Sequence, residues 1–120
     1  EPFLFVKSCV ENLLSNLPVE SSQHENIILI PVCYDDEFGH DLEFIATAND
    51  LSKEKVIAIH QQKEYKVYMM GFLLGFAYMG EVDNIIATPR KQTPRANIEE
   101  GSVGIAGTQT GNYPLSSPGG

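Results

Sequence analysis

The chain has 120 residues, of which 42% are hydrophobic and 20% are charged, and its formal net charge at pH 7 is −8. This length and composition are typical of one globular domain that buries its own hydrophobic core. The negative charge excludes nucleic acids and anionic membrane surfaces as expected partners, because both would repel the protein.

The first segment, residues 1–17, predicts an amphipathic helix, because its apolar residues recur at spacings of three and four. Pro18 would end this helix, and residues 19–25 form a polar linker. The following run NIILIPVCY, Asn26 to Tyr34, is apolar and rich in β-branched residues, so it predicts a strand buried on both faces. We therefore expect residues 1–25 to be a helix and linker from a preceding domain, and residues 26–120 to be a second domain.

Two short helices are expected between residues 35 and 62, with Asp41 as the N-cap of the first and Ser52 as the N-cap of the second. The segment EYKVYMMGF then alternates like a strand, and short strands with glycines and prolines at the turns follow Gly80. The second half is therefore expected to be rich in β-structure. The residues expected to face inward from the two helices are Leu42, Ile45, Ala46, Val56, Ile57 and Ile59.

The two cysteines, Cys9 and Cys33, are too few for a disulfide framework. We expect both to be reduced thiols on buried faces, which indicates a cytoplasmic protein. The uncharged run Val67–Gly80 is shorter than the ~20 residues of a membrane-spanning helix, so we expect no membrane partner. The absence of an initiator Met and the final two glycines indicate a fragment or a chain with disordered ends.

The segment TPRKQTPR, Thr88 to Arg95, is the first candidate site. Its two prolines keep the backbone extended and stiff, which favours an exposed position. It carries three of the chain's eight lysines and arginines, and the planar fork of Arg suits a carboxylate or a phosphate. The alternative is a solvated loop whose arginines pair with Glu99 and Glu100.

The segment GSVGIAGTQTG, Gly101 to Gly111, is the second candidate site. Its four glycines allow backbone N–H groups to approach an anion, and Ser, Thr and Gln side chains add further donors. The alternative is a series of tight turns in a small barrel. Five aromatic residues between Tyr65 and Tyr78 either line a pocket or partner surface or form core. His60 lies near the end of its helix, where the dipole favours a cation, and its role is catalytic or structural.

Four motifs together carry a resemblance to a known family: IPVCYDDEFGHDL, VYMMGFLLGFAYMG, TPRKQTPR and GSVGIAGTQTGNYPLSSPGG. In order and spacing they resemble the C-terminal domain of one family with three names: the Kip-type kinase inhibitor (KipI), the B subunit of 5-oxoprolinase (PxpB) and allophanate hydrolase subunit 1. The resemblance covers roughly residues 27–120 and implies a mainly β fold with short helices, a cyclophilin-like β-barrel. The family pattern continues past Gly120, so the barrel is expected to be truncated at its C-terminal end.

The resemblance implies a subunit of an ATP-dependent 5-oxoprolinase, an amide-ring hydrolase that is not active alone. Its partner would be a larger paralogous subunit (KipA / PxpC type), and ATP with Mg²⁺ would bind in the assembled complex. The alternative is a KipI-type inhibitor that binds a sensor histidine kinase through the aromatic surface. A related module of urea carboxylase uses biotin, but this chain has no biotin-attachment motif. A prolyl isomerase would rest on fold analogy alone.

The resemblance also implies roles for matched residues. Of the departures from the family pattern, Asp35, Asp36 and Glu81 add negative charge, which would weaken anion binding, and His40 and Leu74 replace prolines. No metal site is expected. The expected catalytic residues are His60 and Glu37; the expected substrate- or phosphate-binding residues are Arg90, Arg95, Ser102, Gly107, Gln109, Thr110 and Gly111; and the expected pocket-lining residues are Tyr68, Phe72, Phe76 and Tyr113.

Overall fold

The structure, a computed structural model of the chain, describes residues 2–17 and 26–119. The chain divides into two compact units, residues 1–30 and 31–120. The boundary that we predicted between residues 25 and 26 stays a prediction, since Pro18 and the linker lie outside the described residues.

The first unit contains helix α1 (Pro2–Ser15), which confirms the helix predicted from the apolar spacing. None of its residues is buried, and the apolar side chains of Phe3 and Phe5 are 73% and 71% exposed. Cys9 lies on this helix and is an exposed free thiol, as is Cys33 in the second unit. The prediction that both thiols lie on buried faces is therefore wrong, because each unit leaves its own cysteine exposed.

The strand predicted for residues 26–34 is also wrong, because this segment forms neither helix nor strand. The apolar side chains of residues 27–30 are exposed, and Ile28 and Leu29 reach 80% and 89%, whereas Val32 and Tyr34 are half-buried. β-Branched residues favour an extended backbone, but a strand also needs a neighbouring strand to satisfy its N–H and C=O groups. No described strand pairs with residues 26–34.

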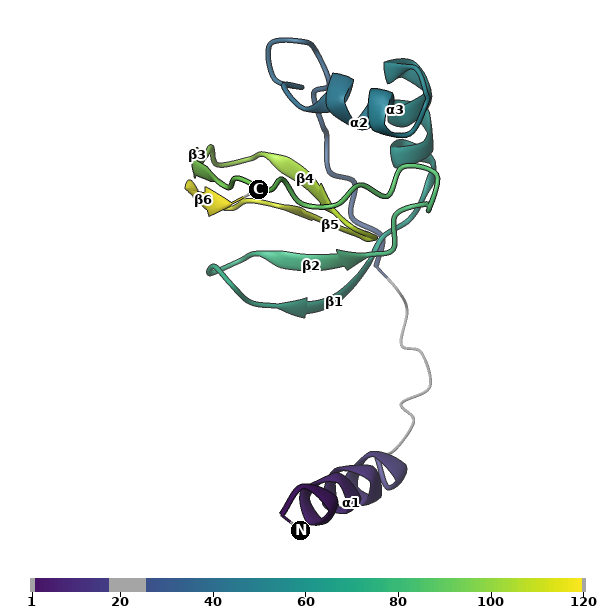
Figure 1. Cartoon of the computed structure of the whole chain (residues 1–120), viewed down its shortest axis with the longest axis vertical. Coiled ribbons are helices and arrows are strands. Elements are labelled where there is room, and N and C mark those ends of the chain that lie inside the picture. Colours follow the sequence, from purple (N-terminus) through teal and green to yellow (C-terminus); the bar gives the residue numbers. More distant parts are fainter. Residues whose placement is uncertain (1, 18–25, 120) are drawn as a thin grey trace. The chain divides into compact units, whose positions relative to one another are not determined.

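The second unit begins with α2 (Leu42–Ala48) and α3 (Lys53–Gln62), the two helices predicted for this region. Figure 1 shows them packed together on one side of the strands. Leu42 and Ala46 from α2 and Val56 from α3 are buried with Val82 and Ile86, and these five residues form the core of the unit. The predicted inward faces of both helices are therefore confirmed.

Helix α3 begins with the N-cap that its sequence predicts. The Ser52 hydroxyl accepts a hydrogen bond from the backbone N–H of Lys55 at 3.2 Å. We expect Ser52→Ala to destabilise the unit by about 1 kcal/mol, because the substitution leaves a helix-end N–H without its partner. Urea unfolding of the variant measures this loss, and Ser52→Asp, which restores a capping oxygen, should recover most of it. Equal stability of the alanine variant and the parent chain would contradict the assignment.

The rest of the second unit consists of two antiparallel sheets. The four-stranded sheet has the order β1 (Lys66–Met70), β2 (Ala77–Gly80), β5 (Gln109–Asn112) and β4 (Val103–Ala106). The second sheet pairs β3 (Arg95–Ile98) with β6 (Ser117–Gly119). The predicted mainly β fold with short helices is confirmed, and the sheets do not close into a barrel within residues 26–119.

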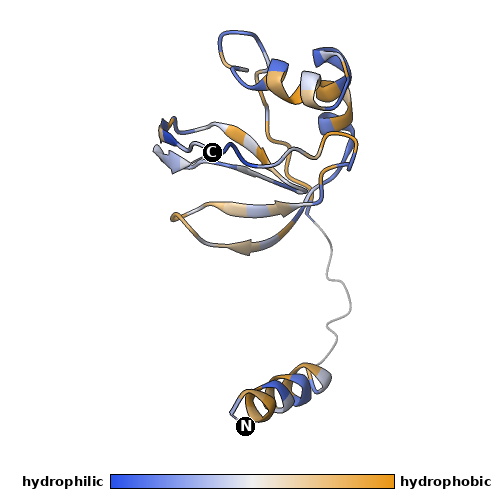
Figure 2. Ribbon diagram, in the orientation of Figure 1, coloured by the Kyte–Doolittle hydropathy of each residue, from blue (hydrophilic) through white to orange (hydrophobic). Residues whose placement is uncertain are grey.

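Strand β1 forms where the alternating pattern predicts it, but it does not alternate in burial. All five of its residues are exposed, and the pairing register with β2 shifts between Val67 and Met69. The shift makes Tyr68 the extra residue of a β-bulge, which changes the faces on which the following side chains lie. Figure 2 shows that this edge hairpin is largely hydrophobic.

Among the described helices, none has both the length and the apolar character required to cross a membrane.

Candidate functional site

Side chains at the two ends of helix α2 form hydrogen bonds with the basic segment Thr88–Arg95. At its N-terminal end, the Asp41 carboxylate accepts two hydrogen bonds from Arg95, at 2.5 and 2.6 Å, and one from Lys91 at 2.5 Å. At its C-terminal end, the Asn49 side-chain amide donates to the Thr88 hydroxyl oxygen at 3.1 Å. The position of the segment beside α2 is therefore fixed by hydrogen bonds to Asp41 and Asn49.

Asp41 does not serve as the side-chain N-cap that the sequence predicts. It occupies the N-cap position, but its side chain makes no capping hydrogen bond to α2. Its oxygens bond to Arg95 and Lys91 instead, because charge-assisted bonds to cations are stronger than bonds to neutral N–H groups. The described ion pairs also do not match the alternative in which the arginines pair with Glu99 and Glu100, because Arg95 pairs with Asp41.

The cluster of Asp41, Lys91 and Arg95 carries one negative and two positive charges. Partial burial by itself would raise the pKa of Asp41, but the hydrogen bonds from Arg95 and Lys91 outweigh it and lower the pKa below 3.8. The hydrogen bond to Asp41 in turn raises the pKa of Arg95. Arg90 is exposed and belongs to none of the ion pairs among the described residues. The segment thus presents positive charge that Asp41 does not neutralise.

The lowered pKa of Asp41 predicts a pH-dependent contribution to stability. A carboxyl group whose pKa is lower in the folded than in the unfolded state stabilises the fold above its ordinary pKa, 3.8, and loses that effect as pH falls through the folded value. We expect Asp41→Asn to be less stable than the parent chain at neutral pH, and the difference to shrink as pH falls below 3.8. Urea unfolding at several pH values measures it.

The control for this measurement is Asp50→Asn, which changes an exposed carboxylate beyond the other end of α2. Asp50 has a φ of 54°, a conformation that Asn also tolerates, so the control introduces no backbone strain. A difference between the Asp41→Asn variant and the parent that does not shrink as pH falls below 3.8 would contradict the ion-pair explanation.

His60 is buried between α3 and the four-stranded sheet. Its Nδ1 lies 2.7 Å from the Tyr34 hydroxyl and its Nε2 lies 3.3 Å from the Thr110 hydroxyl oxygen, while Thr110 donates its own proton to the Gly104 carbonyl at 2.9 Å. Since Thr110 has donated its only proton, Nε2–H of a neutral His60 is the donor in that bond, and Nδ1 accepts from Tyr34. Burial lowers the pKa of His60, which agrees with this neutral form. Burial thus opposes the cationic form that the helix dipole favours at this position.

The two residues predicted to be catalytic are not brought together by any described contact. Glu37 lies exposed in the turn after Tyr34, and its side chain makes none of the described hydrogen bonds or ion pairs. His60 has both ring nitrogens bonded within the protein, which favours the structural alternative for this residue. Their catalytic roles stay predictions.

The segment Gly101–Gly111 forms a hairpin of β4 and β5 rather than an open anion-binding loop. The N–H of Gly101 donates to Tyr113 and the N–H of Gly107 donates to Thr88, at 2.7 and 2.8 Å. Gly111 is buried under the Phe76 ring, where an added Cβ would lie 2.8 Å from Cζ. The structure therefore favours the turn alternative, because these donors and surfaces are already occupied. Of the predicted binding side chains, Gln109 is exposed, Ser102 is half-buried and Thr110 is buried.

The predicted pocket-lining residues separate into two groups. Tyr68 lines a pocket of about 330 Å³ on the four-stranded sheet. Phe76 instead lies at the centre of an aromatic cluster, with its ring centroid 5.6 Å from Phe72, 5.1 Å from Tyr78 and 5.3 Å from Tyr113. Phe72 remains 61% exposed at the hairpin end.

Sequence reasoning missed two residues that hold the candidate site. Tyr34, the donor to His60, lies in a run that predicted a strand, and Asn49 follows a helix without any motif around it. The spacing between Asn49 and Thr88 is 39 residues, so no local pattern connects them. Only the packing of α2 against the segment shows the contact.

Comparison with known proteins gives a consistent result. The family model described as "Carboxyltransferase domain, subdomain C and D" matches residues 5–120. The chain is 52% identical over 119 residues to a protein of Bacillus subtilis (strain 168) that is named as the B subunit of 5-oxoprolinase, covering 99% of this chain and 50% of that protein. It is 45% identical over 111 residues to the protein of the same name from Haemophilus influenzae, covering 92% and 52%.

Two solved structures are also similar. The conserved uncharacterized protein PH0987 from Pyrococcus horikoshii has a TM-score of 0.72 and 57% identity, over 76% of this chain and 42% of that chain. TTHA0988 has a TM-score of 0.78 and 43% identity, over 92% of this chain and 22% of that chain. The chain spans about half the length of the curated relatives it matches. Since the family model covers residues 5–120, the chain belongs to the family described as carboxyltransferase domain, subdomain C and D, and its relatives named as 5-oxoprolinase B subunits confirm the resemblance found in its motifs.

Proposed function

We propose that this chain is part of a subunit of an ATP-dependent 5-oxoprolinase and acts with a larger paralogous subunit. The observation that carries the proposal is the 52% identity over 119 residues to a protein named as the B subunit of 5-oxoprolinase. The relatives' names favour an enzyme subunit over the kinase-inhibitor alternative. The proposal includes a cytoplasmic location and a cyclophilin-like barrel to which the two sheets of this chain contribute.

The exposed basic segment supports the proposal chemically. A lactam is a poor electrophile, and transfer of the γ-phosphoryl group of ATP to its oxygen would convert that oxygen into part of a leaving group. Such a site needs cations that stabilise carboxylate and phosphoryl oxygens as charge develops. Arg90 is exposed, and Lys91 and Arg95 carry one more positive charge than Asp41 neutralises. We assign this segment to the anionic groups of the substrates.

Mg²⁺ would enter this site as the partner of the ATP phosphates. The described residues contain no group of three or more His, Cys, Asp or Glu side chains arranged to hold a metal ion. The proposal therefore gives the chain's own residues the tasks of binding and orienting the anionic groups, and assigns none of them as a metal ligand.

The test is reconstitution of the protein with its candidate partner subunits, followed by an assay of 5-oxoproline-dependent ATP hydrolysis. We expect a stable complex whose ATP hydrolysis requires both 5-oxoproline and this subunit. If a stable complex hydrolyses ATP only in the presence of a different amide, that amide and not 5-oxoproline is the substrate. Full activity of the partners without this subunit would overturn the proposal.

A further inference from the structure

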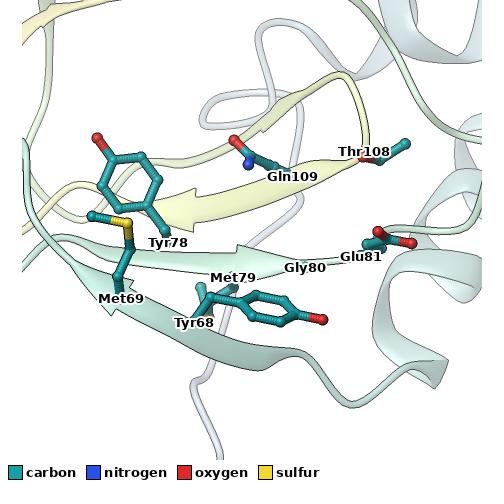
Figure 3. A pocket seen from close by; sticks show the side chains of 8 residues that line it. All are labelled: Tyr68, Met69, Tyr78, Met79, Gly80, Glu81, Thr108 and Gln109. Carbon is teal, nitrogen blue, oxygen red and sulfur yellow. The ribbon is translucent and has the colours of Figure 1, made fainter. Parts of the chain in front are cut away.

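A pocket of about 330 Å³ lies on the face of the four-stranded sheet that points away from His60. Thr110 contacts His60, and side chains alternate along a strand, so the neighbouring Gln109 points to the opposite face. Gly80 is the register partner of Gln109, and Met69 is the register partner of Tyr78. Figure 3 shows Tyr78 and Met69 at one end of this pocket, Glu81 and Thr108 at the other, and Gln109 between them.

Two backbone features shape the pocket. The β-bulge in β1 places the Tyr68 ring on the same face as Met69, two consecutive side chains that a regular strand would send to opposite faces. Gly80 provides the floor, because a Cβ added there would lie 3.4 Å from Cε2 of Tyr68. The Tyr68 ring therefore lies over Gly80 at about van der Waals contact distance.

The lining groups select against anions. None of the eight lining residues is a lysine or arginine, and Glu81 contributes an exposed carboxylate at one end. Lys66 is the register partner of Gly80 but does not line the pocket. The faces of the Tyr68 and Tyr78 rings are electron-rich, and the Met69 thioether adds to the apolar wall. The Gln109 amide oxygen and the Glu81 carboxylate are acceptors for N–H groups.

We propose that this pocket binds an organic cation of the alkylguanidinium class. The planar cation would lie against the Tyr68 ring, with Glu81 as its counter-ion and the Gln109 oxygen accepting one of its N–H groups. The volume of about 330 Å³ is at the small end of ligand pockets and suits a group of this size. The site is separate from the basic segment assigned to anions, and the inference does not depend on the proposed enzymatic function.

The test is an NMR titration of the ¹⁵N-labelled 120-residue chain with N-acetyl-L-arginine amide. The matched probe is N-acetyl-L-citrulline amide, which has nearly the same shape but no charge. We expect the amide signals of Gly80, Glu81 and Gln109 to shift with the arginine compound, and the citrulline compound to bind about tenfold more weakly. Equal binding of the two compounds, or no shift at these residues with the arginine compound, would overturn the inference.

Variants separate the pocket from general charge attraction. Glu81→Gln should weaken binding of the arginine compound about tenfold, whereas Glu64→Gln, which removes an exposed carboxylate outside the pocket, should leave it unchanged. Tyr68→Leu should weaken binding, because it removes the aromatic face of the pocket while keeping an apolar side chain. Equal effects of the Glu81 and Glu64 variants would show nonspecific attraction to an acidic protein and overturn the site.

A final arm distinguishes the source of the guanidinium group. The peptide acetyl-Ala-Arg-Ala-amide presents the same side chain within a polypeptide. Tighter binding of the peptide than of the single amino acid derivative supports the site and indicates an arginine of a protein partner. Equal binding also supports the site and indicates a small guanidinium compound.

Discussion

Arg90→Ala should reduce 5-oxoproline-dependent ATP hydrolysis of the reconstituted complex by about 10²–10³-fold without unfolding this subunit. Arg90 is exposed and makes none of the described ion pairs, so its loss removes charge available to a substrate without breaking an internal contact. Steady-state turnover of the variant complex measures the effect. Unfolding of the isolated variant by urea should be unchanged within about 0.5 kcal/mol.

Two comparison variants make the Arg90 result specific. Arg90→Lys keeps the charge but loses the planar fork, so it should recover only part of the activity. Lys55→Ala removes an exposed cation of α3 from outside the basic segment and should leave turnover unchanged. Near-normal turnover of the Arg90→Ala complex would contradict the assignment of this residue to substrate binding, even if the complex is a 5-oxoprolinase.

Arg95→Ala should also reduce activity, but its effect has a second cause. Arg95 provides two of the three hydrogen bonds to Asp41, so its removal also loosens the attachment of the segment to α2. Unlike Arg90→Ala, this variant should lose stability, and the comparison separates substrate binding from positioning.

His60→Leu should destabilise the second unit by about 2–3 kcal/mol. The substitution places an apolar side chain of similar size in the buried position, but it removes the hydrogen bonds of His60 to the Tyr34 and Thr110 hydroxyl groups. Urea unfolding measures the loss. Gln61→Leu, an exposed change one residue further along α3, should alter stability by less than about 0.5 kcal/mol.

The His60 network also predicts the sign of a pH effect. Burial lowers the pKa of His60 in the folded protein below its ordinary value of 6.5. Just below pH 6.5 the unfolded chain therefore binds more protons than the folded one, and stability falls as pH decreases through this range. His60→Leu should lack this part of the pH dependence. An unchanged pH profile in the variant would contradict the neutral, buried assignment of His60.

Local sequence signals were sufficient where an element depends on its own residues. Helices α1, α2 and α3 form where the apolar spacing predicts them, and Ser52 caps α3 because a serine oxygen reaches an N–H only three residues away. The glycine-rich hairpin also follows from local turn geometry. Its interpretation as an anion site was less reliable, because the partners of its N–H groups come from Thr88 and Tyr113.

Long-range pairing decided the features that the sequence did not predict. Residues 26–34 have the composition of a strand but lack a described neighbouring strand to pair with. Burial of Cys9 and Cys33 would likewise depend on contacts with residues distant in the sequence. Asp41 had two chemically reasonable roles, and the approach of Lys91 and Arg95, 50 and 54 residues away, selected the ion pair. The sequence alone determined the helices, the turns and the family, since these depend on local spacing and motifs. The tertiary structure decided which charges are paired and which side chains enclose His60 or line the pocket, because these contacts join segments that no local pattern connects.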